Sequence, residues 1–151
     1  MTVDAVLASI HHIAAFALVG IIVAELVLLR GRLDGEVIRR FGRIDALYGL
    51  SAAVVVIAGI ARLLFGQTPV DYYLGNLFFW IKMAAFAAVA ILSIYPTALG
   101  VRWRRAIDRD PTYSPPVGEV AAIRRSLTTE VVVLPIIPIA AALMARGFGV
   151  L

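Results

Sequence analysis

Long apolar stretches alternate with short polar ones along the whole chain. Four of them are long enough to cross a bilayer, since a transmembrane helix needs about 20 mostly apolar residues. They cover residues 4–29, 45–64, 72–100 and 123–144. The segment GEVIRRFGRIDALYG, which leads into the second stretch, has helical spacing and indicates an amphipathic start to that helix. The pattern predicts an all-α, four-helix transmembrane bundle that forms a single domain over residues 1–151.

Composition agrees with a membrane protein and changes how the charge is interpreted. Hydrophobic residues make up 62% of the chain and charged residues 16%, whereas soluble domains contain about 45–50% and about 25%. A net charge of +4 in a soluble protein would suggest a nucleic acid partner, but here the basic residues concentrate in two loops. We therefore expect contact with membrane lipid and none with nucleic acid. The absence of cysteine excludes disulfides and thiolate metal sites.

Arginines indicate which loops face the cytoplasm. Of the 14 basic residues, eleven lie in or beside the first and third connections, namely Arg30, Arg32, Arg39, Arg40, Arg43, Arg102, Arg104, Arg105, Arg109, Arg124 and Arg125. The positive-inside rule places both connections in the cytoplasm. We therefore predict a multi-pass protein of the inner (cytoplasmic) membrane with both termini outside. Trp103 and Tyr113 are expected in the aromatic belt at the cytoplasmic interface.

Ionisable residues within the spans fall into two groups at different depths. His11, His12 and Lys82 lie about 10–15 Å from the outer ends of the first and third spans, at 1.5 Å of rise per residue. Charged groups inside a membrane are costly, and they are normally paired or functional. Structural hydrogen bonds and a functional site are the two alternatives for this first group.

The second group lies near the cytoplasmic ends of the spans and comprises Glu25, Asp45, Arg125 and Glu130. Packing of four helices would bring these acids close to arginines of the same depth, such as Arg125. We interpret this group as a structural polar cluster in which acids and arginines pair.

The two adjacent histidines are the only ones in the chain. Neighbouring residues project about 100° apart around a helix, so both cannot ligate one haem iron from opposite sides. His11 shares a face with small residues and Glu25, which slightly favours it as the interior residue. The chain has no HExxH motif and no second ligand at helical spacing, which disfavours a free metal ion. A haem needs only an axial ligand and an apolar pocket.

Two prolines interrupt the fourth span in the sequence LPIIP. Pro135 and Pro138 lack amide hydrogens and leave the carbonyls of Val131 and Leu134 without their helical donors. We predict a kink at this point of the span.

Three stretches carry a family resemblance: ASIHHIAAFALVG, FFWIKMAAFAAVAIL and IRRSLTTEVVVLPIIPIAAAL. They resemble the HemJ-type membrane protoporphyrinogen IX oxidases and, more closely, the small four-span bacterial relatives of these enzymes. The resemblance implies haem b, held by His12 or His11 and by Lys82. It also implies a homo-oligomer that oxidises a porphyrinogen and passes electrons to a membrane acceptor. The Arg125-to-Glu130 stretch is similar to an arginine and acid of that family, whereas the doubled histidine and Glu25 depart from its pattern.

Two other functions fit the same residues. In a small transporter, His11, Lys82 and Glu130 would form a polar or proton path across the membrane. In a non-catalytic partner subunit, the arginine-rich loops would bind anionic lipid or protein.

Overall fold

The computed structural model describes residues 3–151, and helices account for most of them. They are α1 (Val3–Leu28), α2 (Gly35–Phe65), α3 (Val70–Leu74), α4 (Leu77–Arg109), α5 (Val117–Val133) and α6 (Ile136–Ala145). Over these residues β-pairing is limited to one isolated bridge between Asn76 and Val150. Four stretches are long and apolar enough to cross a membrane, namely α1, α2, α4 and the α5–α6 stretch Val117–Ala145. The predicted all-α, four-helix transmembrane bundle is confirmed.

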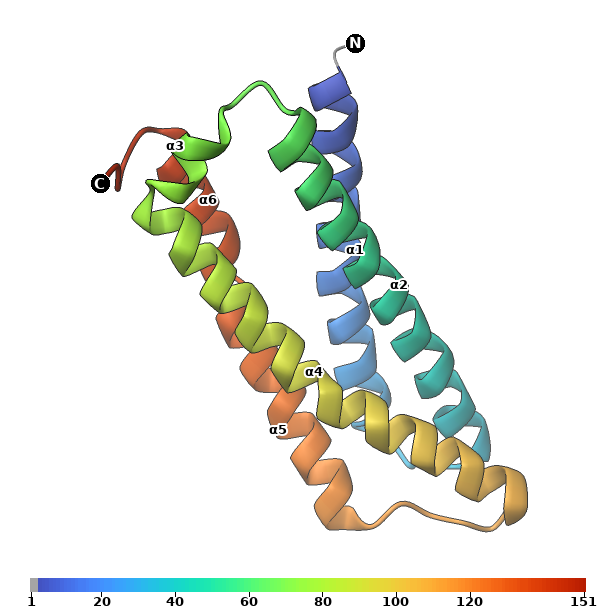
Figure 1. Ribbon diagram of the computed structural model, residues 1–151. Coiled ribbons are helices and arrows are strands. Elements are labelled where there is room, and N and C mark those ends of the chain that lie inside the picture. Colours follow the sequence, from blue (N-terminus) through green and yellow to red (C-terminus); the bar gives the residue numbers. More distant parts are fainter. Residues whose placement is uncertain (1–2) are drawn as a thin grey trace.

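The helices form two pairs that meet near one end of the molecule (Figure 1). α1 packs along α2, and α4 packs along α5 and α6, while α2 contacts α4 and α1 contacts α5 to join the pairs. Both chain termini lie at the end where the pairs diverge, which we call the terminal end (Figure 1). The opposite end, with the connections over residues 29–34 and 110–116, is called the loop end.

The apolar core is concentrated toward the loop end. Its fully buried side chains come from α1, α2, α4 and α5 and from the residue after α1; they are Ile22, Leu29, Ile38, Phe41, Trp103, Ile107, Ile123 and Leu127. The rings of Phe41 and Trp103 lie 6.2 Å apart between centroids. Trp103 therefore faces the core, and its position at the cytoplasmic interface stays a prediction. Its indole Nε1–H donates to Glu119 Oε2 over 2.7 Å, which satisfies the polar end of a buried ring.

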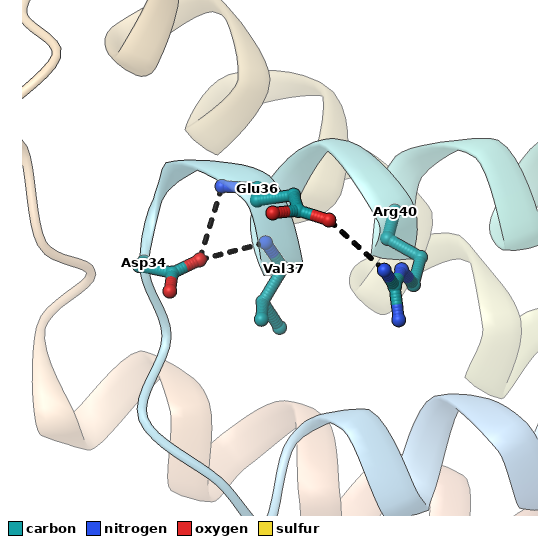
Figure 2. A network of polar contacts seen from close by, with 4 residues as sticks. All are labelled: Asp34, Glu36, Val37 and Arg40. Carbon is teal, nitrogen blue, oxygen red and sulfur yellow. Dashed lines mark hydrogen bonds and ion pairs between the residues drawn. The ribbon is translucent and has the colours of Figure 1, made fainter.

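α2 begins ten residues before the predicted apolar span, as an amphipathic turn. Asp34 caps the helix, because its Oδ1 accepts hydrogen bonds from the amides of Glu36 at 3.0 Å and Val37 at 2.9 Å (Figure 2). Arg40 pairs with Glu36 one turn away, at 3.0 Å. Ile38 and Phe41 on this turn are buried, which extends the core beyond the apolar stretch.

The predicted third span, residues 72–100, differs from the structure at both ends. Its first residues lie in the short helix α3, which ends at Leu74, and a new helix, α4, begins at Leu77. The two are separate because Asn76 is extended, and its side chain accepts a hydrogen bond from the amide of Phe78 and so caps α4. α4 then continues through Arg109, since Trp103 and Ile107 still face the core. The chain after α6 closes on this junction, where the amide of Leu77 donates to Gly149 O and the amide of Leu151 donates to Gly75 O.

Prolines disturb two helices in different ways. The fourth membrane-crossing stretch breaks between α5 and α6 at Leu134 and Pro135, so the structure shows the interruption that was predicted there. Pro96 instead lies inside α4 without ending it. Proline at this position leaves the carbonyl of Leu92 without its helical donor. The Ser126 hydroxyl on α5 donates to that carbonyl at 2.8 Å and replaces the missing bond.

Candidate functional site

His11 lies on the face of α1 that points into the bundle. It shares this face with the buried residues Leu18, Ile22 and Glu25, which follow it at helical spacing. Its Nδ1–H donates to the carbonyl oxygen of Val55 on α2 over 3.0 Å. This bond fixes the ring and leaves Nε2 as the nitrogen with a free lone pair.

Gly59 on α2 makes room for that ring. A Cβ atom added at Gly59 would lie 3.3 Å from Cε1 and 3.6 Å from Nδ1 of His11. The imidazole therefore sits directly against the α2 backbone, in a space that only glycine leaves fully open.

His12 points in another direction. It is exposed on the outer face of α1, and its Nδ1–H donates to Ala8 O within the same helix at 2.6 Å. The two imidazole rings are nearly perpendicular, with centroids 5.9 Å apart. Of the two histidines, His11 is the one that the fold directs into the bundle.

Lys82 lies on the interior face of α4, at the same end of the bundle. It is half-buried and precedes the buried residues Ala85, Val89 and Pro96 at helical spacing. Its Nζ lies 5.1 Å from the centroid of the Phe79 ring, a cation–π distance. The fold thus brings Lys82 and His11 to one end of the bundle from different helix pairs.

Arg62 is the third polar residue of this region. It lies within electrostatic reach of both His11 and Lys82. Its Nε is 3.6 Å from Asp4 Oδ1. The buried Nε has no hydrogen-bond partner within residues 3–151. We refer to His11, Arg62 and Lys82 as the His–Lys site.

The donor set of the His–Lys site is one imidazole and one amine, which is fewer ligands than a free metal ion needs. Residues 3–151 contain no group of three His, Cys, Asp or Glu side chains that could hold a metal ion. A haem brings four nitrogen ligands of its own, so one imidazole, or an imidazole and an amine, completes its coordination.

The second predicted group of residues forms a buried cluster of acids. Glu25 on α1, Asp45 on α2 and Glu130 on α5 are all buried, together with Tyr48 on α2. The Tyr48 hydroxyl donates to Glu130 Oε2 over 3.4 Å, and the Thr97 hydroxyl on α4 donates to Asp45 Oδ1 over 2.7 Å. We call Glu25, Asp45, Tyr48 and Glu130 the acid cluster.

Arg125 does not join this cluster, so the expected pairing of acids and arginines is corrected here. Arg125 is exposed and lines a shallow groove between α4 and α5 with Tyr95 and Ser126. Ion pairs within residues 3–151 join Arg40 to Glu36, Arg62 to Asp4, and Arg102 to Glu119. None includes a carboxylate of the acid cluster, because the arginines project outward from the helix ends while the acids face the core.

Sequence reasoning missed the residues that position these groups. Val55 and Gly59 hold His11 through a backbone carbonyl and an open space, neither of which leaves a chemical signal in a sequence. Thr97 is an ordinary residue in an apolar span until the fold places it beside Asp45. One signal was usable. A proline within a span frees a backbone carbonyl, and a polar side chain at similar depth on another helix can bond to it.

Comparison with known proteins identifies a family but no characterised relative. The family model described as "Predicted membrane protein (DUF2214)" matches residues 3–149. No curated protein and no solved structure shows a significant match to the chain.

Proposed function

The chain belongs to the family described as Predicted membrane protein (DUF2214), and from this premise we propose that it is a haem b-binding membrane protein. The observation that carries the proposal is the His–Lys site. An interior imidazole on α1, fixed through Nδ1, and an interior amine on α4 lie at the same end of the bundle.

Each residue of the site has a role in this proposal. His11 Nε2 is the primary iron ligand, and the Val55 carbonyl holds the ring in the tautomer that keeps Nε2 free. Lys82 is the second ligand, which must lose its proton to bind iron. Arg62 would bind a haem carboxylate through its guanidinium, which is also paired with Asp4. His12, exposed on the other face, is not a ligand.

The arrangement of the helices supports a group bound between the pairs. His11 and Lys82 come from the two helix pairs, one from α1 and the other from α4, so a group bound by both residues would link the pairs. A bound haem would supply one-electron redox chemistry, with its potential set by the axial ligands and by burial. The resemblance to HemJ-type oxidases extends the proposal to porphyrinogen oxidation, a membrane electron acceptor and a homo-oligomer.

Purified variants test the ligands directly. Wild type, His11→Ala, His12→Ala and Lys82→Ala are made in haem-replete cells, and each is assayed for its Soret band and by pyridine haemochrome. We expect His11→Ala to lose the band, Lys82→Ala to change the spin state, and His12→Ala to resemble wild type. Wild-type protein without any Soret absorption would refute the proposal, and an effect confined to His12→Ala would reassign the ligand.

A matched pair of glycine variants tests the role of the α2 backbone. Gly59→Ala places a methyl group against the His11 ring, whereas a Cβ at Gly49 on the same helix meets nothing within 4 Å. Gly59→Ala should shift the Soret band or lower haem occupancy, and Gly49→Ala should do neither. Equal spectra for the two variants would show that the His11 ring is not the group that binds iron.

A further inference from the structure

The acid cluster is separate from the His–Lys site and has no part in haem binding as proposed. Glu25 follows His11 by 14 residues on the same helix, which is about 21 Å of rise. The cluster joins α1, α2 and α5 near the loop end, and Thr97 adds a contact from α4. Its chemistry therefore needs an explanation of its own.

Two of its carboxyl groups are buried, and each has one oxygen without a hydrogen-bond partner among residues 3–151. Glu25 exposes 2% of its surface and Glu130 exposes 0%. Glu25 Oε1 and Glu130 Oε1 have no hydrogen-bond partner within residues 3–151. An ionised carboxylate in a low-dielectric core is strongly disfavoured unless a cation or hydrogen-bond donors compensate it.

The surroundings of the cluster supply no positive charge. The buried titratable groups of this region are Glu25 from α1, Asp45 and Tyr48 from α2, and Glu130 from α5, and Tyr48 is hydrogen-bonded to Glu130. No ion pair in the described part of the chain links them to Arg, Lys or His. Three acids without a cation repel one another when ionised, so uptake of a positively charged ligand would stabilise the cluster.

That ligand is small. No arrangement of three carboxylates with metal-ligand geometry occurs within residues 3–151. A proton needs only one oxygen, and each unpartnered carboxyl oxygen offers such a position. We propose that the acid cluster is a proton-binding site within the membrane domain, in which at least one of Glu25 and Glu130 carries a proton at neutral pH.

Asp45 connects the acid cluster to an exposed side chain near the loop end. Thr97 lies 20 residues into α4, and Asp45 lies 20 residues before the end of α2. Each is thus about 30 Å from the terminal end, which is about the thickness of the hydrocarbon core. Thr97 is exposed, and its hydroxyl donates to Asp45. Asp45 is therefore the member of the cluster that is hydrogen-bonded to an exposed side chain.

Glu130 lies closer to the terminal end than Asp45 along its helix. It is 15 residues from the end of α6, or about 22 Å of rise. The Tyr48 hydroxyl bonds to it, and Tyr48 is one helical turn from Asp45 on α2. Uptake is a transfer from hydronium at the loop end to a carboxylate, which forms one O–H bond and releases water without any redox change.

Infrared spectroscopy of the purified chain in lipid tests this site without reference to haem. A protonated carboxylic acid has a carbonyl stretch that is distinct from the carboxylate bands and shifts in heavy water. We expect wild type to keep this band at neutral pH and to lose it only on alkalinisation. Glu25→Gln and Glu130→Gln should each reduce the band, whereas the exposed, ion-paired Glu36→Gln should leave it unchanged.

Two further measurements keep the test decisive. Tyr48→Phe removes the hydroxyl bonded to Glu130 and should shift the frequency of the band without removing it. If a Gln variant fails to fold by circular dichroism, the pH titration of the wild-type band still decides. Absence of a protonated carboxyl band in wild type at neutral pH would overturn the proposal, as would a band insensitive to both Gln substitutions. Haem-free and haem-loaded samples should give the same result, so failure here is distinguishable from failure of haem binding.

Discussion

At the scale of single residues, a serine hydroxyl replaces the backbone hydrogen bond that a proline removes from α4. Pro96 lies within α4 and is buried, yet the helix continues past it to Arg109. The Ser126 hydroxyl on α5 donates to the Leu92 carbonyl that the proline leaves free. A carbonyl in the membrane interior has no water as a hydrogen-bond donor. The Ser126 hydroxyl therefore satisfies the free carbonyl of α4 and joins α5 to α4 at this point.

Ser126→Ala should therefore destabilise the bundle by about 0.5–1.5 kcal/mol, the usual contribution of such a hydrogen bond. Thr128→Ala is the matched control, because its hydroxyl bonds within its own helix to Arg124 O. The measurement is unfolding in mixed detergent micelles. Pro96→Ala returns an amide donor to Leu92, so Ser126→Ala should cost less in that background. An equal cost with and without Pro96 would contradict this account.

At the scale of the elements, the C-terminal segment holds the start of α4 in place. The amide of Leu77 donates to Gly149 O at 2.8 Å, and Asn76 Nδ2 donates to Phe148 O at 3.0 Å. The Tyr72 hydroxyl of α3 donates to the Met144 carbonyl at the end of α6, at 2.6 Å. These bonds lie at the terminal end, where the helix pairs are apart, and they tie α3 and α4 to α6.

Two glycines in this segment allow a matched test. Gly147 and Gly149 both have positive φ, at 80° and 79°. A Cβ at Gly147 meets nothing within 4 Å, whereas one at Gly149 would lie 2.6 Å from Phe78 Cδ2. Gly147→Ala should cost about 1–2 kcal/mol through backbone strain alone. Gly149→Ala should cost more, because the segment must also move off α4.

Thermal unfolding in detergent, combined with proteolysis of the C-terminus, measures both effects. Gly149→Ala should expose the last residues to carboxypeptidase, and Gly147→Ala should leave them largely protected. The same melting temperature and the same cleavage rate for both variants would show that the segment does not pack as described.

At the scale of the whole molecule, an even number of spans places both termini on one side of the membrane. Both ends of the chain lie at the terminal end (Figure 1), and eleven of the 14 basic residues lie in or beside the connections at the loop end. The positive-inside rule favours the orientation with the loop end in the cytoplasm. The His–Lys site would then lie in the outer half of the bilayer and the acid cluster near the cytoplasmic face.

Alkaline phosphatase fused after Leu151 should be active, because the enzyme folds only outside the cytoplasm. The same enzyme inserted in the loop over residues 110–116 should be inactive. A reporter that functions only in the cytoplasm, placed at the same two positions, is the control and should give the reverse pattern. Activity in the loop and none at the C-terminus would invert the orientation.

Sequence alone determined the class of this protein and the positions of its polar residues along the spans. A bilayer allows few solutions, since every backbone group in lipid must bond internally, and four apolar stretches therefore mean four spanning helices. Rise per residue then placed His11 with Lys82, and Glu25 with Asp45, at matching depths. The break at Pro135 followed from the same local rules.

Only the tertiary structure decided which side chains meet. Adjacent histidines differ by about 100° around the helix, and the packing of α1 on α2 turned His11 inward and left His12 exposed. The same packing gathered Glu25 and Glu130 without an arginine. Helix rotation and pairing depend on contacts between residues far apart in the chain, such as Phe41 with Trp103, and hydropathy along the chain contains no record of them.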